Sequence, residues 1–297
     1  GGIKNRETIH CNENGYYSIY NSDRHGFNNQ DKIWDEVDVQ YLLLGDSFVH
    51  GRCVNEPDTI SGNLKKKNLT IKNLGWNGSG PLIQYAILKE FFPEKNVKKI
   101  VWFFYENDFY DLERELKNKI LLKYKNNEKF TQNLKNNKNA DKIKIETFNE
   151  RLRSSQLPNI KKEKNLKDLF LYAINTETAK IIKIYHLRNL INKLAIYEEY
   201  ESILKKMKIL SNKKDVDLFL VYLPSFQTVS GKNNNDNFYE KKLKRMSEKH
   251  QINFININQI LFKNNQEDPL KFFAYEHSHY NEIGYAKIAN IIFNQTK

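Results

Sequence analysis

The stretch Val39–Leu44, VQYLLL, followed at once by Gly45-Asp46-Ser47, decides the fold. A short apolar run that ends at a glycine is typical of a parallel strand whose two faces are both covered. Gly45 permits a tight turn, so Ser47 would lie where the end of the strand meets a loop. A serine there can act as a nucleophile if a base and oxyanion donors lie near it. For an isolated G-D-S tripeptide, a serine that begins a helix is the alternative.

Four further apolar runs follow along the chain: Leu69–Leu74, Lys99–Tyr105, Val216–Leu223 and Ile252–Ile257. Helical patterns separate them, and one of these begins at Pro81, which is tolerated in the first turn of a helix. Five strands that alternate with helices predict an α/β/α fold around a parallel sheet of about five strands. In such sheets the ligand binds beyond the carboxyl ends of the strands, where the Gly- and Asn-rich turns would lie.

A leader and an insertion lie outside this alternation. Residues 1–37 are polar and aromatic, with Asn, Asp and Gly punctuation, which predicts an ordered, loop-rich leader. Residues 110–213 carry helical patterns rich in Lys and Asn, which predict a helical insertion packed beside the sheet as a lid or an oligomer surface. The α/β core would comprise residues 38–109 and 214–297, in agreement with the length of 297 residues.

The chain is basic, with a formal net charge of +12 from 48 Lys and Arg against 36 Asp and Glu. Such a balance is compatible with nucleic acid, an anionic membrane or an acidic polymer as partner. The excess, however, is mostly lysine and accompanies abundant Asn and Ile, which indicates compositional drift in an AT-rich genome. We expect no nucleic-acid partner, because the sequence has no Arg-rich helix, RNP-like aromatic pattern or zinc-finger spacing.

The two cysteines are Cys11 and Cys53. Without a CxxC motif, two thiols cannot form a structural zinc site by themselves. They are either free buried thiols or one disulfide formed in an oxidising compartment. We favour the disulfide, since Cys53 follows the Ser47 turn and Cys11 lies in a leader that must be tied down. No metal or other cofactor is expected: His277 and His279 could share a metal, but the sequence offers no evident third ligand.

Four short blocks follow the predicted strands in order. They are Gly45-Asp46-Ser47, Asn73–Gly78 (NLGWNG), Glu106-Asn107-Asp108 and Glu276–Tyr285 (EHSHYNEIGY), the last of which precedes the final helical pattern. Together they resemble the SGNH (GDSL-type) hydrolase superfamily, and this resemblance implies a flavodoxin-like three-layer fold. Four sequence segments resemble those of a bacterial subgroup of SGNH proteins found among surface-polysaccharide genes. These segments are SDRHGFNN, LLLGDSFVHG, NLGWNGSGPL and WFFYEND.

The resemblance implies a role for each block. Ser47 would be the nucleophile, and His279 its general base and acid. The oxyanion hole would consist of the backbone N–H groups of Ser47 and Gly78 and the side-chain amide of Asn107. The family usually has Asp three residues before the histidine, so Glu276 is expected to orient His279, with a main-chain carbonyl as the alternative.

Four residues near these blocks are candidates for substrate binding: His50, Trp76, Glu106 and Arg24. The alternatives are an ordinary loop histidine, a tryptophan packed in the core and an arginine in a salt bridge within the leader. Glu106 follows Tyr105, which stands where the family usually has Gly. These two residues would make the wall of the oxyanion hole bulkier and more acidic.

The function implied by the resemblance is that of a serine esterase acting on O-acyl esters, foremost O-acetyl esters, of a carbohydrate. An O-acyltransferase that modifies a surface polysaccharide is one alternative. A non-catalytic glycan-binding domain is another, which Glu276 and Tyr105 keep open. No apolar run is long enough to span a bilayer. We expect an extracytoplasmic or periplasmic location, with a signal or membrane anchor upstream of this sequence.

Overall fold

The computed structural model describes residues 2–93, 96–137, 139, 141–146, 149–150, 179–231, 238–264 and 268–297, with the backbone alone for 179–193. The centre of the expected helical insertion, residues 151–178, lies outside the described residues. Within the described ranges, no helix combines the length and the apolar character that crossing a membrane requires.

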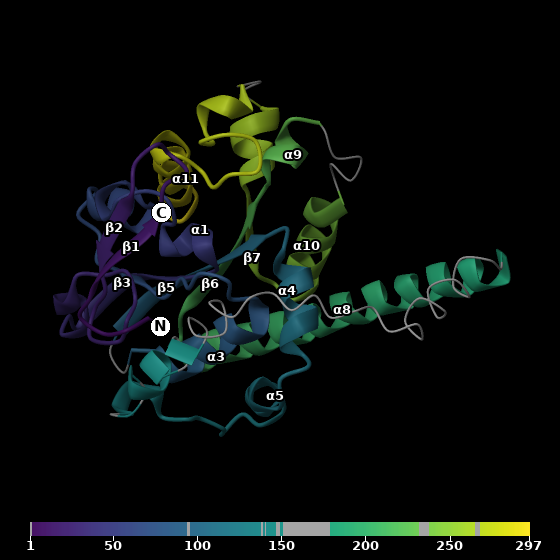
Figure 1. Ribbon diagram of the computed structural model, residues 1–297, viewed down its shortest axis with the longest axis horizontal. Coiled ribbons are helices and arrows are strands. Elements are labelled where there is room, and N and C mark those ends of the chain that lie inside the picture. Colours follow the sequence, from purple (N-terminus) through teal and green to yellow (C-terminus); the bar gives the residue numbers. More distant parts are fainter. Residues whose placement is uncertain are drawn as a thin grey trace.

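Five parallel strands form the central sheet (Figure 1). They are β3 (Asp38–Leu44), β4 (Ile71–Asn73), β5 (Asn96–Tyr105), β6 (Asp217–Leu223) and β7 (Asn253–Asn256). Their order is β4-β3-β5-β6-β7, and every neighbouring pair is parallel. This is the flavodoxin-like order, in which the direction of winding reverses between β3 and β5 and opens a crevice at their carboxyl ends. The predicted parallel α/β sheet is therefore confirmed.

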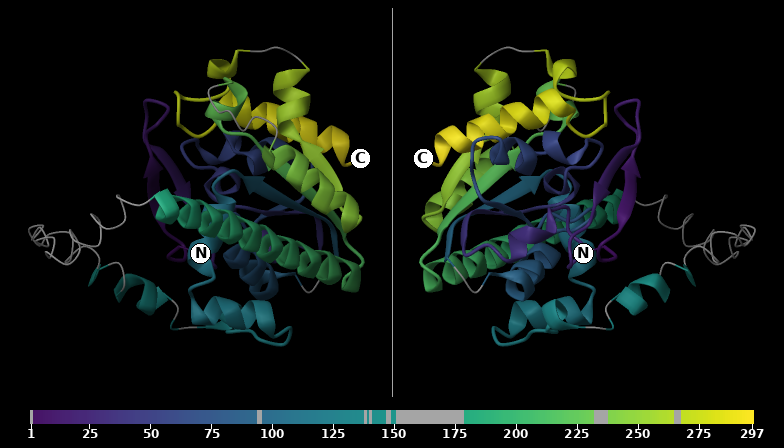
Figure 2. Two further views of the ribbon diagram at one scale, coloured as in Figure 1. Left: turned by 90° about the vertical axis from the view of Figure 1, so that its right-hand side faces the viewer. Right: turned by 90° about the vertical axis from the view of Figure 1, so that its left-hand side faces the viewer.

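Helices cover both faces of the sheet, because the strands are apolar on both faces. In β3, Leu42 and Leu44 belong to one buried cluster, whereas Leu43 belongs to the other. The first face packs against α3 (Pro81–Phe91), α4 (Asp108–Glu115), α8 (Ala179–Lys213) and α10 (Phe238–Lys249), and the second against α1 (Ser47–His50), α2 (Ile60–Lys65) and α11 (Glu282–Gln295). Figure 2 shows α8 and α11 on opposite sides of the sheet.

Several shorter helices lie in the connections. They are α5 (Lys119–Asn126), α9 (Phe226–Val229), the 3₁₀ turns η1 (Asp31–Trp34), η2 (Glu56–Asp58), η3 (Leu134–Asn136) and η5 (Pro269–Lys271), and the π-helical turn η4 (Asn258–Lys263).

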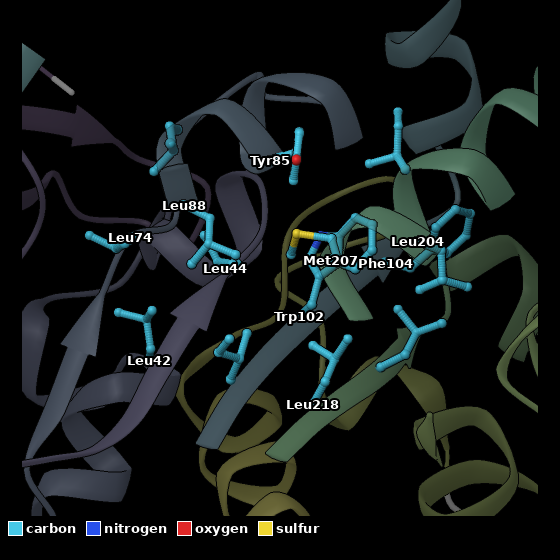
Figure 3. Close-up of a cluster of buried hydrophobic side chains, with 14 of the residues drawn as sticks. Leu42, Leu44, Leu74, Tyr85, Leu88, Trp102, Phe104, Leu204, Met207 and Leu218 are labelled. Carbon is cyan, nitrogen blue, oxygen red and sulfur yellow. The ribbon is translucent and has the colours of Figure 1, made fainter. Parts of the chain in front are cut away.

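The C-terminal half of α8 belongs to the core, although it falls in the range expected for the insertion. Its fully buried apolar residues are Tyr200, Ile203, Leu204 and Met207, and their spacing places them on one stripe of the helix. Tyr200 stacks on Trp102 of β5 with ring centroids 5.6 Å apart. Figure 3 shows Trp102 in the same buried cluster as Leu204 and Met207. The second segment of the packed α/β unit therefore begins before residue 214.

The leader, expected to be rich in loops, contains an antiparallel hairpin of β1 (Glu7–Cys11) and β2 (Ser18–Asn21). Figure 1 shows this hairpin beside α1 and α11. The carboxylate of Asp23 then accepts four hydrogen bonds from the segment 25–34. Within that segment, Asn29 exchanges two hydrogen bonds of 2.9 Å with the backbone of Asn73. The leader is thus joined to the end of β4.

Glu115, at the end of α4, caps the N-terminus of α3. Its carboxylate accepts hydrogen bonds from the backbone N–H groups of Gly80 (2.6 Å), Leu82 (2.9 Å) and Ile83 (3.3 Å). Burial raises the pKa of Glu115 to about 7, even though these bonds favour the ionised form. The contact between the two helices therefore contains a carboxyl group that titrates near neutral pH.

This raised pKa predicts how stability depends on pH. The folded protein holds the Glu115 proton more tightly than the unfolded chain, so this group stabilises the fold fully below the unfolded pKa and loses that contribution as pH rises through the folded pKa. Glu115→Gln removes the titration. Relative to E115Q, the unfolding free energy of the wild type should fall by about 3 kcal/mol between pH 4 and pH 8, as measured by urea titration. Parallel pH profiles of the two proteins would contradict this account.

Candidate active site

Ser47 lies on the turn that joins β3 to α1, and it is 8% exposed. Asp46 caps α1 by accepting a hydrogen bond from the backbone N–H of Phe48 at 3.0 Å. Burial raises the pKa of Asp46 to about 6. A Cβ atom on Gly45 would lie 2.4 Å from the side chain of Val49, so the sharp turn requires glycine at this position.

The structure brings Ser47 and His279 together although they are 232 residues apart. The hydroxyl Oγ of Ser47 lies 2.9 Å from Nε2 of His279. The ring of Phe48 packs against the imidazole with centroids 4.6 Å apart. A hydroxyl within hydrogen-bond distance of an imidazole nitrogen is the arrangement that activates a serine as a nucleophile.

The carboxylate beside His279 comes from the leader and belongs to Glu13. Its Oε2 lies 2.9 Å from Nδ1 of His279 and also accepts the backbone N–H of that residue at 2.7 Å. Because a carboxylate can only accept hydrogen bonds, Nδ1 carries the proton, and Nε2 is left to accept from the hydroxyl of Ser47.

Glu276 does not take the position predicted for it. It is exposed on a turn that the backbone N–H of Ser278 closes by donating to the carbonyl of Tyr275 at 3.1 Å. Glu13 occupies Nδ1 of His279 instead, so the alternative of a main-chain carbonyl at this nitrogen is not realised either.

Three contacts hold the loop that carries Glu13. The disulfide expected between Cys11 and Cys53 is present, with the two Cα atoms 4.9 Å apart. The side chain of Asn14 donates to the carbonyl of Cys53 at 2.9 Å, and the hydroxyl of Tyr16 donates to Glu282 at 2.5 Å. The tip of the hairpin is thus fastened both to the chain that follows Ser47 and to α11.

Glu13 is ionised in this environment. Burial favours its neutral form, but hydrogen bonds from the side chain and backbone of His279, together with the positive charge of Arg52, outweigh burial and lower the pKa of Glu13. The resulting negative charge is suited to stabilise the imidazolium that forms when His279 takes up a proton.

The expected oxyanion donors meet at one pocket of about 350 Å³, which Ser47, Gly78 and Asn107 all line. Gly78 has φ +73°, a conformation that favours glycine. Among the described residues, neither the backbone N–H of Gly78 nor the side-chain amide of Asn107 has a hydrogen-bond acceptor. Both are therefore available to an oxygen atom that develops negative charge.

Asn73 holds the loop that leads to Gly78 against α1. Its side-chain amide donates to the carbonyl of Val49 at 2.7 Å, and its Oδ1 accepts the backbone N–H of Gly75 at 2.8 Å. A Cβ atom on Gly75 would lie 2.5 Å from the backbone nitrogen of His50. The loop can approach the Ser47 turn this closely only because residue 75 has no side chain.

The rest of the pocket is polar and charged. Its other lining residues are Phe48, Arg52, Asn77, Tyr105, Asp111, Arg114, His277, Ser278 and His279. The ring of Tyr105, which stands where the SGNH family usually has Gly, packs on Phe48 with centroids 4.1 Å apart. Burial raises the pKa of Tyr105, so its hydroxyl stays neutral.

Two of the predicted substrate-binding residues are packed behind the Ser47 turn. His50 is buried, and its Nδ1 lies 3.2 Å from Nε2 of His10. Burial lowers the pKa of both histidines, which keeps them neutral. Trp76 packs against the core and against the ring of His50, with centroids 5.2 Å apart. Neither residue lines the pocket.

The other two predicted substrate-binding residues form structural contacts, and they do not line the pocket either. Glu106 accepts hydrogen bonds from the hydroxyl of Tyr222 (2.8 Å) and from the backbone and side chain of Ser225. It thereby joins the carboxyl ends of β5 and β6. Arg24 forms ion pairs with Asp31 (2.6 Å) and Asp35 (2.7 Å) within the leader.

In the part of the chain that the structure describes, one group of side chains lies close enough to share a metal ion, namely Cys11, Glu13 and Cys53. Its two sulfur atoms are joined in the disulfide, and its carboxylate is hydrogen-bonded to His279. His277, the other half of the H-x-H pair, contacts the side chain of Gln227.

No family model and no curated protein matches the chain. The fold is similar to a lipolytic protein of the G-D-S-L family from Desulfitobacterium hafniense DCB-2, with 11% identity and a TM-score of 0.47 over 88% of this chain and 99% of that one. It is also similar to the acetyl xylan esterase AlAXEase (11%, 0.48, 87% and 100%). A third similar structure is Axe2, an acetylxylan esterase from Geobacillus stearothermophilus (12%, 0.45, 87% and 95%).

Separate replacement of Glu13 and Glu276 tests which of the two carboxylates orients His279. Glu13→Gln should lower kcat for ester hydrolysis by about 100-fold or more, because an amide no longer fixes the tautomer of His279 or stabilises its charge. Glu276→Gln, the matched control on the exposed turn, should change kcat by less than about twofold. The opposite ranking in steady-state kinetics would return the role to Glu276.

Reduction of the disulfide tests whether the hairpin must be clamped. Dithiothreitol should lower kcat by about tenfold or more, since a shift of the order of 1 Å in a catalytic group is costly. A Cys11→Ser, Cys53→Ser double variant should show the same loss and no further response to the reductant. Circular dichroism would establish that the sheet stays folded. Full activity of the reduced protein would show that catalysis does not require the Cys11–Cys53 disulfide to hold the hairpin.

Proposed function

We propose that the protein is a serine esterase of SGNH type that cleaves O-acyl esters, foremost O-acetyl esters, of a carbohydrate. The observation that carries this proposal is the 2.9 Å contact between the Ser47 hydroxyl and Nε2 of His279, with Glu13 on the opposite ring nitrogen. A hydroxyl, an imidazole and a carboxylate in this sequence form the catalytic unit of serine hydrolases on unrelated folds. The four motif blocks that converge at the carboxyl edge of the sheet support it.

In the proposed reaction, Ser47 attacks the ester carbonyl while its proton passes to Nε2 of His279. The N–H groups of Ser47 and Gly78 and the amide of Asn107 bind the oxyanion, and one such donor is typically worth about 3–4 kcal/mol in the barrier. His279 then gives its proton to the departing sugar hydroxyl, which leaves the acyl group on Ser47. Water, activated by the same imidazole, attacks this ester and releases the acid.

The pocket favours a short acyl group over a fatty acyl chain. Its lining includes Arg52, Asp111 and Arg114, and burial of these charges against a long apolar chain would be costly. A volume of about 350 Å³ accommodates an acetyl group together with part of a sugar. The disulfide supports an oxidising, extracytoplasmic compartment.

A nucleophile variant tests the proposal. Ser47→Ala should lower turnover of p-nitrophenyl acetate by about 1,000-fold or more, and a fluorophosphonate should label the wild type at Ser47 alone. Ser230→Ala, a serine outside the pocket lining, is the matched control and should keep both properties. Turnover by S47A at the wild-type rate would refute the assignment of Ser47 as the nucleophile.

Acylated products define the reaction further. Incubation with O-acetylated oligosaccharide should release acetate, which mass spectrometry and acetate assay detect. Acetyl groups found on an added glycan acceptor would instead identify a transferase. Glycan binding without turnover and without labelling of Ser47 would identify a binding domain.

A further inference from the structure

Arg52 brings a positive charge into the pocket that no carboxylate neutralises at close range. It lines the pocket with Ser47 and His279, and no Asp or Glu among the described residues lies within ion-pair distance of its guanidinium. The charge of Arg52 does reach Glu13, whose pKa it helps to lower. The two oxygen atoms of Glu13, however, are already engaged by His279.

The second arginine of the pocket differs in this respect. Arg114 forms an ion pair with Asp111 one turn earlier on α4, and it lies over the ring of Tyr110 at 5.2 Å from the centroid. Its charge is compensated within the protein. Arg52 is therefore the cation of this pocket that still has binding capacity.

The position of Arg52 is fixed next to the reacting atoms. Its backbone N–H donates to the carbonyl of Ser47 at 3.0 Å, and its own carbonyl accepts from the hydroxyl of Tyr285 at 3.1 Å. Its Nη1 donates to Oδ1 of Asn77 at 3.0 Å, and Asn77 directly precedes the oxyanion donor Gly78. The guanidinium is thus held between the nucleophile turn and the oxyanion loop.

Toward the part of the chain that the structure describes, most of the hydrogen-bonding capacity of this guanidinium is unused. A guanidinium has five N–H donors in a planar fork that matches a carboxylate. One of these is spent on Asn77, and Nε is buried without an acceptor. A cation held in this way at a partly enclosed site is prepared to bind an anion, because the interaction is stronger there than in open water.

We propose that Arg52 binds a carboxylate of the substrate, so that the enzyme selects acylated acidic carbohydrates over neutral ones. This inference rests on the proposed esterase function and names the substrate class of the same site. The carboxylate can belong to the sugar, as in a uronic acid, or to the acyl group, as in a hemisuccinate. A purely structural role for Arg52, in which it only holds Asn77, predicts instead equal effects on acidic and neutral esters.

Two pairs of esters matched in shape test this. One pair is O-acetylglucuronic acid against O-acetylglucose, and the other is the 4-nitrophenyl ester of hemisuccinate against that of monomethyl succinate. For at least one pair, the wild type should show a kcat/KM that is about tenfold or more higher for the acidic member, chiefly through KM. Added NaCl should reduce this preference. The pair that shows it identifies which part of the substrate carries the carboxylate.

Variants assign the preference to Arg52. In Arg52→Gln the ratio of kcat/KM for acidic over neutral ester should fall to about one, whereas Arg52→Lys should keep part of it, since lysine retains the charge but not the fork. Arg245→Gln, which removes an exposed arginine of α10 outside the pocket lining, is the matched control and should keep the wild-type ratio. No preference in the wild type for either pair, or an unchanged ratio in R52Q, would overturn the inference.

A binding measurement separates this inference from the esterase proposal. If the wild type cleaves none of the four esters, the esterase proposal fails, and binding of glucuronate, hemisuccinate and glucose to the Ser47→Ala protein is measured by calorimetry. At least one of the two acids should bind about tenfold or more tighter than glucose. This difference in affinity should vanish in the double variant that carries both S47A and R52Q. Equal binding of the acids and glucose would overturn the anion site as well.

Discussion

The contact between the Glu13 carboxylate and His279 is the constraint on which the rest of the site depends. One oxygen atom of Glu13 binds both the ring nitrogen and the backbone N–H of His279, so it fixes the orientation of the imidazole and the path of its loop together. A partly buried carboxylate is stabilised by such donors, and a histidine needs such an acceptor to present its other nitrogen to a hydroxyl. The leader, which contains the hairpin and Cys11 of the disulfide, therefore contributes the carboxylate that contacts His279.

The sheet supplies the other half of the arrangement. Gly78, Ser47 and Asn107 follow β4, β3 and β5, which are adjacent in that order, and parallel strands bring their carboxyl ends to one edge. Gly45 and Gly75 let these loops approach within distances that a Cβ atom would forbid. Glu106 and Asn73 form hydrogen bonds with Ser225 and Val49, and these bonds join neighbouring segments at this edge.

The sequence predicted the parts that follow local rules. The five strands are recognisable because burial of both faces produces continuous apolar runs, and Ser47 and His279 because they stand in motif blocks at strand ends. Glu13 has no such local signal, and Glu276 occupies the position that the family pattern favours. A signal did exist in the two cysteines. A Cys11–Cys53 bond places Glu13, two residues further on, beside the turn that carries Ser47.

Other differences arise from contacts that spacing does not specify. His50, Trp76, Glu106 and Arg24 lie near the motif blocks in sequence, but whether a loop residue faces a pocket or a neighbouring loop depends on tertiary packing. Tyr200 and Met207 lie in a region whose Lys- and Asn-rich composition resembles an exposed insertion, although their helical stripe packs in the core. The average composition of a segment does not show that a helix is amphipathic, whereas the periodicity of its apolar residues does.

The separation of Glu13 and His279 by 266 residues has a consequence for how the protein becomes functional. The contact between this carboxylate and this imidazole closes a long loop of the polypeptide. Such a closure comes late, because its entropic cost must be met by structure already formed. During synthesis, Glu13 can bind His279 only after the segment that contains His279 has been made, so the imidazole acquires its charged partner later than the Ser47 turn acquires its shape.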